Sequence, residues 1–237
     1  MSKHILIAVT NTPQWGQHDI PTGLWFGELT HFVGAIEKAG HTWEVCSPKG
    51  GDIPLDPRSL GWLFMNASDH ALRADADFME RLKGTMASAD VDSSGFDGIF
   101  YAGGHGTMWD FPDDPSLQRL AAEIYERGGV VAAVCHGVAG LLNIERADGT
   151  KLIDGVTVTG YSDMEEYVAG DKKFVPYSLQ GALSERGATF KRSFLPFSPH
   201  VVVEGRVITG QNPRSAALVG QALARLVAQD QEVEHAA

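Results

Sequence analysis

The residues best suited to chemistry in this sequence surround a cysteine that follows five small apolar residues. Cys135 comes directly after Val-Val-Ala-Ala-Val at 130–134 and directly before His136 and Gly137. Small and β-branched residues in a row are typical of a strand buried on both faces, and the glycine-rich segment that follows predicts a helix. We therefore expect Cys135 at a sharp strand-to-helix turn, where it can serve as the nucleophile of a nucleophile elbow.

A cysteine nucleophile needs a lowered pKa, a proton carrier and donors for a developing oxyanion. Backbone amides at the start of the predicted helix favour a thiolate at Cys135. His136 can carry protons if a carboxylate fixes its ring, and the amides of Gly104 and His136 can form an oxyanion hole. These features predict that Cys135 is ionised near neutral pH. The alternative is a small buried hydrophobe, the usual state of a free cysteine.

Two further predicted strands end in residues that could complete such a site. The strand at 96–102 runs into a glycine-rich turn, and the strand at 156–159 runs into the acidic segment 160–166. The carboxyl ends of parallel strands meet at one edge of an open α/β sheet, where ligands usually bind. We expect both segments beside Cys135. The predicted oxyanion and substrate-binding residues are Gly103, Gly104 and His105.

Strand-like and helix-like segments alternate along the chain, which predicts an α/β fold with a mostly parallel central sheet flanked by helices. The segment from 50 to about 95 is expected as an irregular excursion with short helices near 59 and 75, within one domain covering 1–237. The tail from 229 is expected to fray. Further strands are predicted at 5–9 and 42–47, a hairpin at 201–209, and helices at 24–38, 113–128, 176–187 and 216–228.

Composition narrows the functional classes. The 237 residues carry a formal net charge of −11, which argues against nucleic acid or an anionic membrane as a partner. Two cysteines are too few for a disulfide framework. The remaining histidines show no ligand spacing, so no metal site is expected. No apolar run approaches membrane-spanning length and no signal-peptide cleavage region follows Met1, so a cytoplasmic location is expected.

Several motifs taken together resemble the ThiJ/PfpI superfamily, and among its branches the heat-shock chaperone and glyoxalase III proteins. The resemblance spans nearly the whole chain and implies a flavodoxin-like fold of the class I glutamine amidotransferase-like type. The matching motifs are Ala-Val-Cys-His-Gly at 133–137, Gly-Gly-His-Gly-Thr-Met-Trp-Asp-Phe-Pro at 103–112, Thr-Gly-Gln-Asn-Pro at 209–213, Thr22-Gly23 with Glu28, and Thr159-Gly160 with Glu166.

The resemblance implies a role for each matching residue. Cys135 matches the family nucleophile, and His136 matches the family histidine. Glu28 matches a protonated glutamate that hydrogen-bonds the cysteine sulfur, as a carboxyl with a raised pKa can do. Glu166 is the expected acidic partner of His136. Glu165 is the fallback and Asp163 a third choice, because the spacing does not separate them.

The implied activity is conversion of methylglyoxal, a small 2-oxoaldehyde, to lactate through a hemithioacetal on Cys135. No cofactor, glutathione or metal is expected, and the resemblance implies a homodimer. The alternatives are a stress chaperone or protein deglycase, a cysteine amidase or peptidase-like hydrolase, and a redox sensor. A chaperone ranks second because no long exposed apolar stripe is identified. Glutamine hydrolysis is disfavoured because the histidine follows the cysteine directly, without a late His-x-Glu motif.

Overall fold

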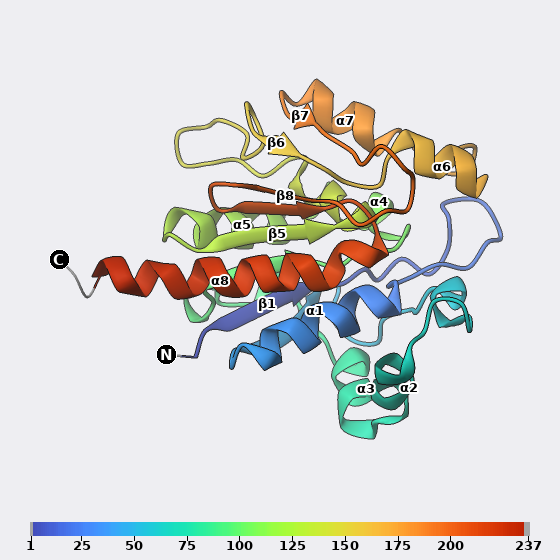
Figure 1. The fold of residues 1–237 in the computed structure, drawn as a ribbon, viewed down its shortest axis with the longest axis horizontal. Coiled ribbons are helices and arrows are strands. Elements are labelled where there is room, and N and C mark those ends of the chain that lie inside the picture. The colour runs from blue at the N-terminus through green and yellow to red at the C-terminus, as the bar shows by residue number, and fades with distance from the viewer. Residues whose placement is uncertain (1, 235–237) are drawn as a thin grey trace.

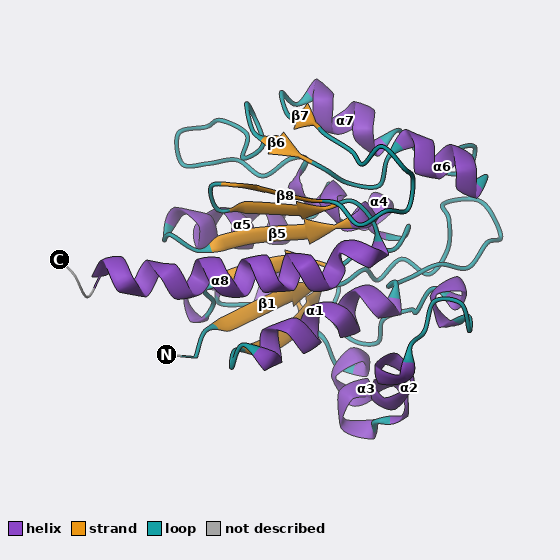
Figure 2. Ribbon diagram, viewed as in Figure 1, coloured by secondary structure: helices purple, strands orange, loops and turns teal. Residues whose placement is uncertain are grey.

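A seven-stranded sheet forms the centre of the computed structural model, which describes residues 2–234 and the side chains as far as Ala228. The strands run in the order β3-β2-β1-β4-β5-β9-β8 (Figures 1 and 2). All neighbours are parallel except β8 and β9, so the predicted mostly parallel sheet is confirmed. The strands are β1 (His4–Ala8), β2 (Thr42–Ser47), β3 (Met86–Ala87), β4 (Gly98–Tyr101), β5 (Val130–Val134), β8 (Val201–Glu204) and β9 (Val207–Gly210).

Alternation along β1 divides the core into two layers. Ile5 and Ile7 join one buried cluster, and Leu6 and Ala8 join another. Successive side chains of a strand point to opposite faces, so each cluster lies on its own side of the sheet. Burying one such aliphatic side chain contributes about 1.5–3 kcal/mol. The sheet is therefore stabilised from both faces, as the apolar run predicts.

Helices cover both faces. α1 (Phe26–Lys38) and α8 (Ala216–Glu234) lie side by side on one face (Figure 1). They can approach closely because residue 220 is glycine: a Cβ there would meet Ala35 and the Phe32 carbonyl. α5 (Pro115–Glu126) covers the other face, beginning where the Asp114 side chain accepts a hydrogen bond from the Leu117 amide.

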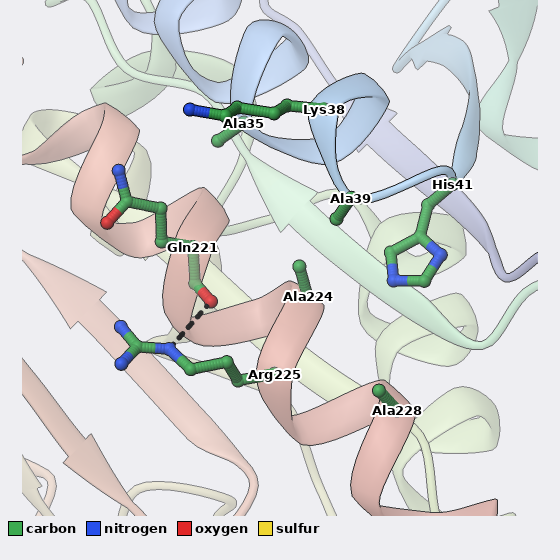
Figure 3. A pocket seen from close by; sticks show the side chains of 8 residues that line it. All are labelled: Ala35, Lys38, Ala39, His41, Gln221, Ala224, Arg225 and Ala228. Carbon is green, nitrogen blue, oxygen red and sulfur yellow. Dashed lines mark hydrogen bonds between the residues drawn. The ribbon is translucent and has the colours of Figure 1, made fainter.

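A pocket of about 530 Å³ opens where the end of α1 meets α8 (Figure 3). It lies on the outer side of this helix pair, and none of the predicted site residues lines it. The residues that line it are Ala35, Lys38, Ala39, His41, Gln221, Ala224, Arg225 and Ala228.

The excursion that follows β2 is largely helical. It contains η1 (Pro57–Leu60), α2 (Ala67–Ala74) and α3 (Ala76–Lys83) before β3 joins the sheet edge, followed by the short turns η2 (Ser88–Asp90) and η3 (Ser93–Gly95). A capping box between Asn66 and Asp69 starts α2. The buried Asp69 carboxylate also accepts a hydrogen bond from Thr30 of α1. This bond fixes α2 against the helix that begins beside the candidate site.

The expectation for 156–159 is wrong in one respect. β6 (Thr157–Val158) pairs with β7 (Thr189–Phe190) in a separate two-stranded sheet, and it is not a strand of the central sheet. The chain is instead tied to β9 through a side chain, because the Thr159 amide donates to Thr209 Oγ1 at 2.9 Å. The acidic segment after it forms a helix, α6 (Asp163–Ala169), that was not predicted.

Other bounds differ less. α7 (Leu179–Glu185) is shorter than predicted because Ser178 caps its start through the Gly181 amide. The last helix continues to Glu234, beyond the expected end at 228, and residues 235–237 lie outside the described part. Within residues 2–234, no helix combines the length and apolar character needed to cross a membrane.

Candidate active site

Cys135 lies at the junction of β5 with η4 (Cys135–Leu141), a 3₁₀ helix in the place where a helix was expected. Its φ is +56°, in the left-handed region that non-glycine residues seldom adopt. Such strain costs about 1–3 kcal/mol and gathers at functional sites. The turn closes tightly because residue 137 is glycine, and a Cβ there would meet the carbonyl oxygens of Tyr101 and Ala102. The backbone thus has the geometry of a nucleophile elbow.

Glu28 reaches this cysteine from the first turn of α1. Its side chain is completely buried, and its Oε2 accepts a hydrogen bond from the Gly103 amide at 2.7 Å. Burial raises the pKa of Glu28 to about 8, against the lowering effect of the Cys135 thiol and the Gly103 amide. A carboxyl with this pKa is mostly protonated at neutral pH and can donate a hydrogen bond.

His136 joins the cysteine to a second carboxylate. Its Nδ1 lies 3.5 Å from Cys135 Sγ, and its Nε2 lies 2.6 Å from Glu166 Oε1. Burial opposes ionisation of Glu166, but the charge of His136 and the hydrogen bonds of His105 and His136 hold the pKa of Glu166 below its usual range. The pair is therefore suited to stabilise a protonated imidazole at His136.

The structure distinguishes among the three acidic residues that were candidate partners of His136. Glu165 closes a capping box with Ser162 and accepts hydrogen bonds from the Phe197 amide and Asn212 Nδ2. Asp163 accepts a hydrogen bond from Ser178. Neither has a hydrogen bond to His136, so the acidic neighbour of that ring is Glu166.

Burial opposes the expected ionisation of Cys135, which stays a prediction. The thiol is 3% exposed, and burial raises its pKa well above the ordinary value. Glu28 raises the pKa further, and the backbone N–H of His136 opposes it. The buried sulfur and carboxyl therefore hold their protons together, and His136 Nδ1 is the nearby base that can accept the thiol proton.

The predicted substrate-binding segment divides into different roles. Gly103 donates its amide to Glu28, so this N–H does not face an open oxyanion site. Gly104, at φ +117°, packs against the Gly23 carbonyl. His105 is buried beside His136, with ring centroids 3.9 Å apart. Of these three residues, only His105 brings a side chain to the His136–Glu166 pair.

Three potential metal ligands meet within the described residues. Ligand atoms of His105, His136 and Glu166 lie within 4.8 Å of one another. However, Arg58 Nη2 lies 2.9 Å from His105 Nδ1, and a guanidinium can only donate. In a neutral ring the proton is then on Nε2, the nitrogen that faces Glu166. Metal-binding histidines have the opposite arrangement, in which the second nitrogen donates. The cluster therefore suits a hydrogen-bond donor better than a metal ligand.

The sequence reasoning missed several residues of this site. Arg58 comes from the excursion, and Trp15 stacks on His105 with centroids 4.1 Å apart. Tyr161, which lies in the segment expected beside Cys135 but was given no role, packs on His136 at 4.4 Å. Asp171 follows α6 and accepts from Arg58 Nη1 at 3.1 Å. The short turn Asp56-Pro57-Arg58 belongs to the segment that was expected only as an irregular excursion. A buried hydrogen bond between Thr22 and Asp56 anchors this turn, and nothing in the sequence pattern marks it.

A doubly wound sheet with a strained cysteine at a strand end, a buried glutamate beside it and a histidine–carboxylate pair defines a class of cysteine-dependent α/β proteins. The DJ-1/PfpI family matches residues 27–226, and the chain belongs to this family.

This chain is similar to two curated relatives and one solved structure over most of its length. Glyoxalase 3 of Candida albicans is 31% identical over 90% of this chain and 93% of its own length. The glutathione-independent glyoxalase HSP31 of Saccharomyces cerevisiae is also 31% identical, with the same coverage. The crystal structure of Rapid Encystment Protein 24 kDa from Francisella tularensis is 34% identical, covers 95% of this chain and 99% of its own, and has a TM-score of 0.90.

Proposed function

We propose that this chain is a glutathione-independent glyoxalase that converts methylglyoxal and water to lactate. The observation that carries the proposal is the buried Cys135 at its elbow, with Glu28 beside it and the His136–Glu166 pair within reach of the sulfur. Relatives that match nine-tenths of the chain have this activity in their names. The site also has a neutral carboxyl and a base, the two proton carriers that such an isomerisation needs.

The first step is addition of Cys135 Sγ to the aldehyde carbon. His136 Nδ1, 3.5 Å from the sulfur, takes the thiol proton as the C–S bond forms, and Glu166 stabilises the resulting imidazolium. The proton then passes to the former aldehyde oxygen. The product is a hemithioacetal, and His136 is neutral again.

The second step moves a hydrogen from the former aldehyde carbon of the substrate to its former ketone carbon. His136 and Glu28 act as the proton carriers: a proton leaves the hemithioacetal carbon, an enediol forms, and the former ketone carbon is protonated. The result is a thioester of lactate. Water then attacks the thioester carbonyl, the C–S bond breaks, and the sulfur regains its proton. One carbon is oxidised as its neighbour is reduced, so the balanced reaction consumes one water and requires no external redox partner.

The test is lactate production from methylglyoxal without glutathione. Wild type is expected to be active, and Cys135→Ala is expected to be inactive. Cys46→Ala is the matched control, because Cys46 is buried in the cluster on the opposite side of the sheet from Cys135. Lactate formation by Cys135→Ala at the wild-type rate would contradict the proposal. Turnover of amides, peptides or glycated side chains in preference to methylglyoxal would favour a hydrolase or deglycase.

A second candidate, a chaperone that holds unfolded clients, is favoured by one feature. The adjacent side chains Trp62, Leu63 and Phe64 are 82%, 70% and 52% exposed, although no such apolar stripe was identified in the sequence. Exposed apolar patches often mark interaction sites. If this run holds clients, Trp62→Ser with Leu63→Ser removes suppression of aggregation and leaves lactate production intact. The control is Leu218→Ser, a change at a side chain that is 42% exposed and has no exposed large apolar neighbour in the sequence.

We further propose that residues 1–237 form one domain, that the protein is a homodimer and that it resides in the cytoplasm. The family match over residues 27–226 supports a single domain, and the dimer follows from the resemblance of the motifs. A single cooperative unfolding transition, a dimer mass in light scattering and recovery in the cytosolic fraction are the expected results.

A further inference from the structure

A second imidazole lies directly against the one that the proposed reaction uses. The ring of His105 lies between Trp15 and His136, with centroid distances of 4.1 and 3.9 Å. Only 4% of the residue is exposed. Its protonation state is therefore set by the groups around it and not by solvent. The charged and titratable groups that face it are Arg58, His136, Tyr161, Glu166 and Asp171.

These neighbours fix the tautomer of His105 from both sides. Arg58 Nη2 donates to Nδ1 at 2.9 Å, while Nε2 lies 3.6 Å from Glu166 Oε2 and 3.7 Å from Asp171 Oδ2. The reversed tautomer would direct an N–H at the guanidinium and a lone pair at two carboxylates. Both contacts would be repulsive. The Nε2–H tautomer is therefore the one that the site accepts.

Arg58 is itself held in place. Its Nε and Nη2 donate to Asp56, and its Nη1 donates to Asp171. Asp56 is completely buried, and the guanidinium lies over the Trp15 ring at 4.8 Å. A guanidinium presents its donors in a rigid fork, so these partners determine where the second N–H of Nη2 points. Arg58, which belongs to the excursion, thus places one fixed N–H donor at His105 Nδ1.

The same arrangement keeps His105 uncharged. Burial lowers the pKa of His105 to about 3, and His136 and Arg58 add to this effect against the carboxylate of Glu166. The charge matters because the adjacent His136 must hold a proton while the sulfur adds to substrate. A second cation with its ring 3.9 Å away would disfavour that proton.

We propose that Arg58 and His105 are positioning residues for the His136–Glu166 pair: Arg58 keeps His105 neutral in its Nε2–H form, so that His136 alone gains a proton during turnover. Nε2–H of His105 then faces Glu166 Oε2 while Oε1 of the same carboxylate engages His136. Hydrogen bonds of this kind are often long without substrate and shorten in the reactive complex. The role in turnover rests on the proposed function, but the state of His105 does not.

The first experiment needs no substrate. Nitrogen-15 spectra of the histidine rings, with His105 identified by comparison with His105→Asn, report tautomer and charge. The expected result is a neutral ring with its proton on Nε2 throughout pH 5.5–8. A ring that titrates in this range, or that has its proton on Nδ1, overturns the proposal. Because the readout does not depend on activity, a wild type that makes no lactate defeats the proposed function alone.

The second experiment uses kinetics. In Arg58→Gln, His105 loses its fixed donor and can protonate as the pH falls. The kcat/KM of the variant relative to wild type is expected to fall from pH 8 to 5.5, by at most about tenfold, because burial still opposes protonation of His105 and a histidine of ordinary pKa is about one-tenth neutral at pH 5.5. Adding His105→Asn should remove this pH dependence. A ratio equal at both pH values, or one that still falls in the double variant, overturns the proposal. A purely structural role of Arg58 would lower activity equally at both pH values.

Discussion

Oε1 of Glu166 lies 2.6 Å from Nε2 of His136, while Glu165, its neighbour in sequence, is directed to Phe197 and Asn212. Glu166→Gln preserves the shape of the side chain and removes the charge that stabilises a protonated imidazole. We expect kcat to fall by about 10²-fold or more, the usual contribution of acid–base catalysis. Steady-state lactate formation from methylglyoxal measures the change.

The matched control is Glu165→Gln. Its amide would place a donor among the donors that now bind this carboxylate, so we expect a loss of about 1–3 kcal/mol in the free energy of unfolding. Activity per folded molecule should change much less than in Glu166→Gln. The opposite pattern, with Glu165→Gln inactive and fully stable, would reassign the acidic partner of His136.

The raised pKa of Glu28 predicts a stability that depends on pH. Between pH 4.5, the ordinary pKa of a glutamate, and about pH 8, the folded protein retains a proton that the unfolded chain releases. The free energy of unfolding therefore falls as pH rises through this window, by about 1.4 kcal/mol per pH unit for this group. Glu28→Gln should remove that component. Urea unfolding of both proteins at pH 5, 6.5 and 8 measures the difference in slope, and equal slopes would contradict the assignment.

The buried thiol predicts slow alkylation at neutral pH. Burial and Glu28 raise the pKa of Cys135, so its rate of reaction with iodoacetamide should keep rising to pH 9 without a plateau near 7. Glu28→Gln removes a carboxyl that ionises near pH 8, so it should accelerate alkylation at pH 9. Mass spectrometry of the Cys135 peptide measures both rates. A plateau below pH 7 in wild type would restore the low-pKa thiolate that the sequence suggests.

The glycine turn beside the elbow predicts a steep cost for one added methyl group. Gly104 has φ +117°, and a Cβ there would overlap the Gly23 carbonyl and lie 2.9 Å from the Trp25 amide. Gly104→Ala is therefore expected to lose more than about 3 kcal/mol of stability, the range of severe core disruption. Gly128→Ala is the control, because Gly128 has φ +94° with open space around it. It should lose only about 1–2 kcal/mol, the cost of a left-handed conformation for a residue with a Cβ, and similar losses in both variants would exclude crowding as the cause.

Local patterns in the sequence predict most of the sheet and the centre of the site. Thr42–Ser47 and Val130–Val134 are strands with the predicted bounds. Val130–Val134 is a continuous apolar run, which has few alternatives once it is buried. Cys135, His136 and Glu28 meet because strand ends and the start of α1 share one edge of the sheet. The motifs that resemble the family place the same three residues together.

The features of the site that the sequence did not predict depend on contacts between distant segments. The choice of Glu166 over Glu165 follows from the Ser162 capping box, which takes one carboxylate away from the site. Arg58 enters through a turn fixed by the buried Asp56. The raised pKa of Cys135 arises from complete enclosure, which no local pattern reports.

Because α6 lies outside the central sheet, heat can separate loss of catalysis from loss of the fold. This seven-residue helix is joined to its surroundings mainly through side chains, including the bonds of Glu165 to Phe197 and Asn212. On warming, it should detach before β5 and its neighbours melt, and Glu166 would leave His136 while the circular dichroism of the sheet stays unchanged. The upper working temperature of the protein would then be set by one short helix, and substitutions that anchor it would extend that limit without altering the core.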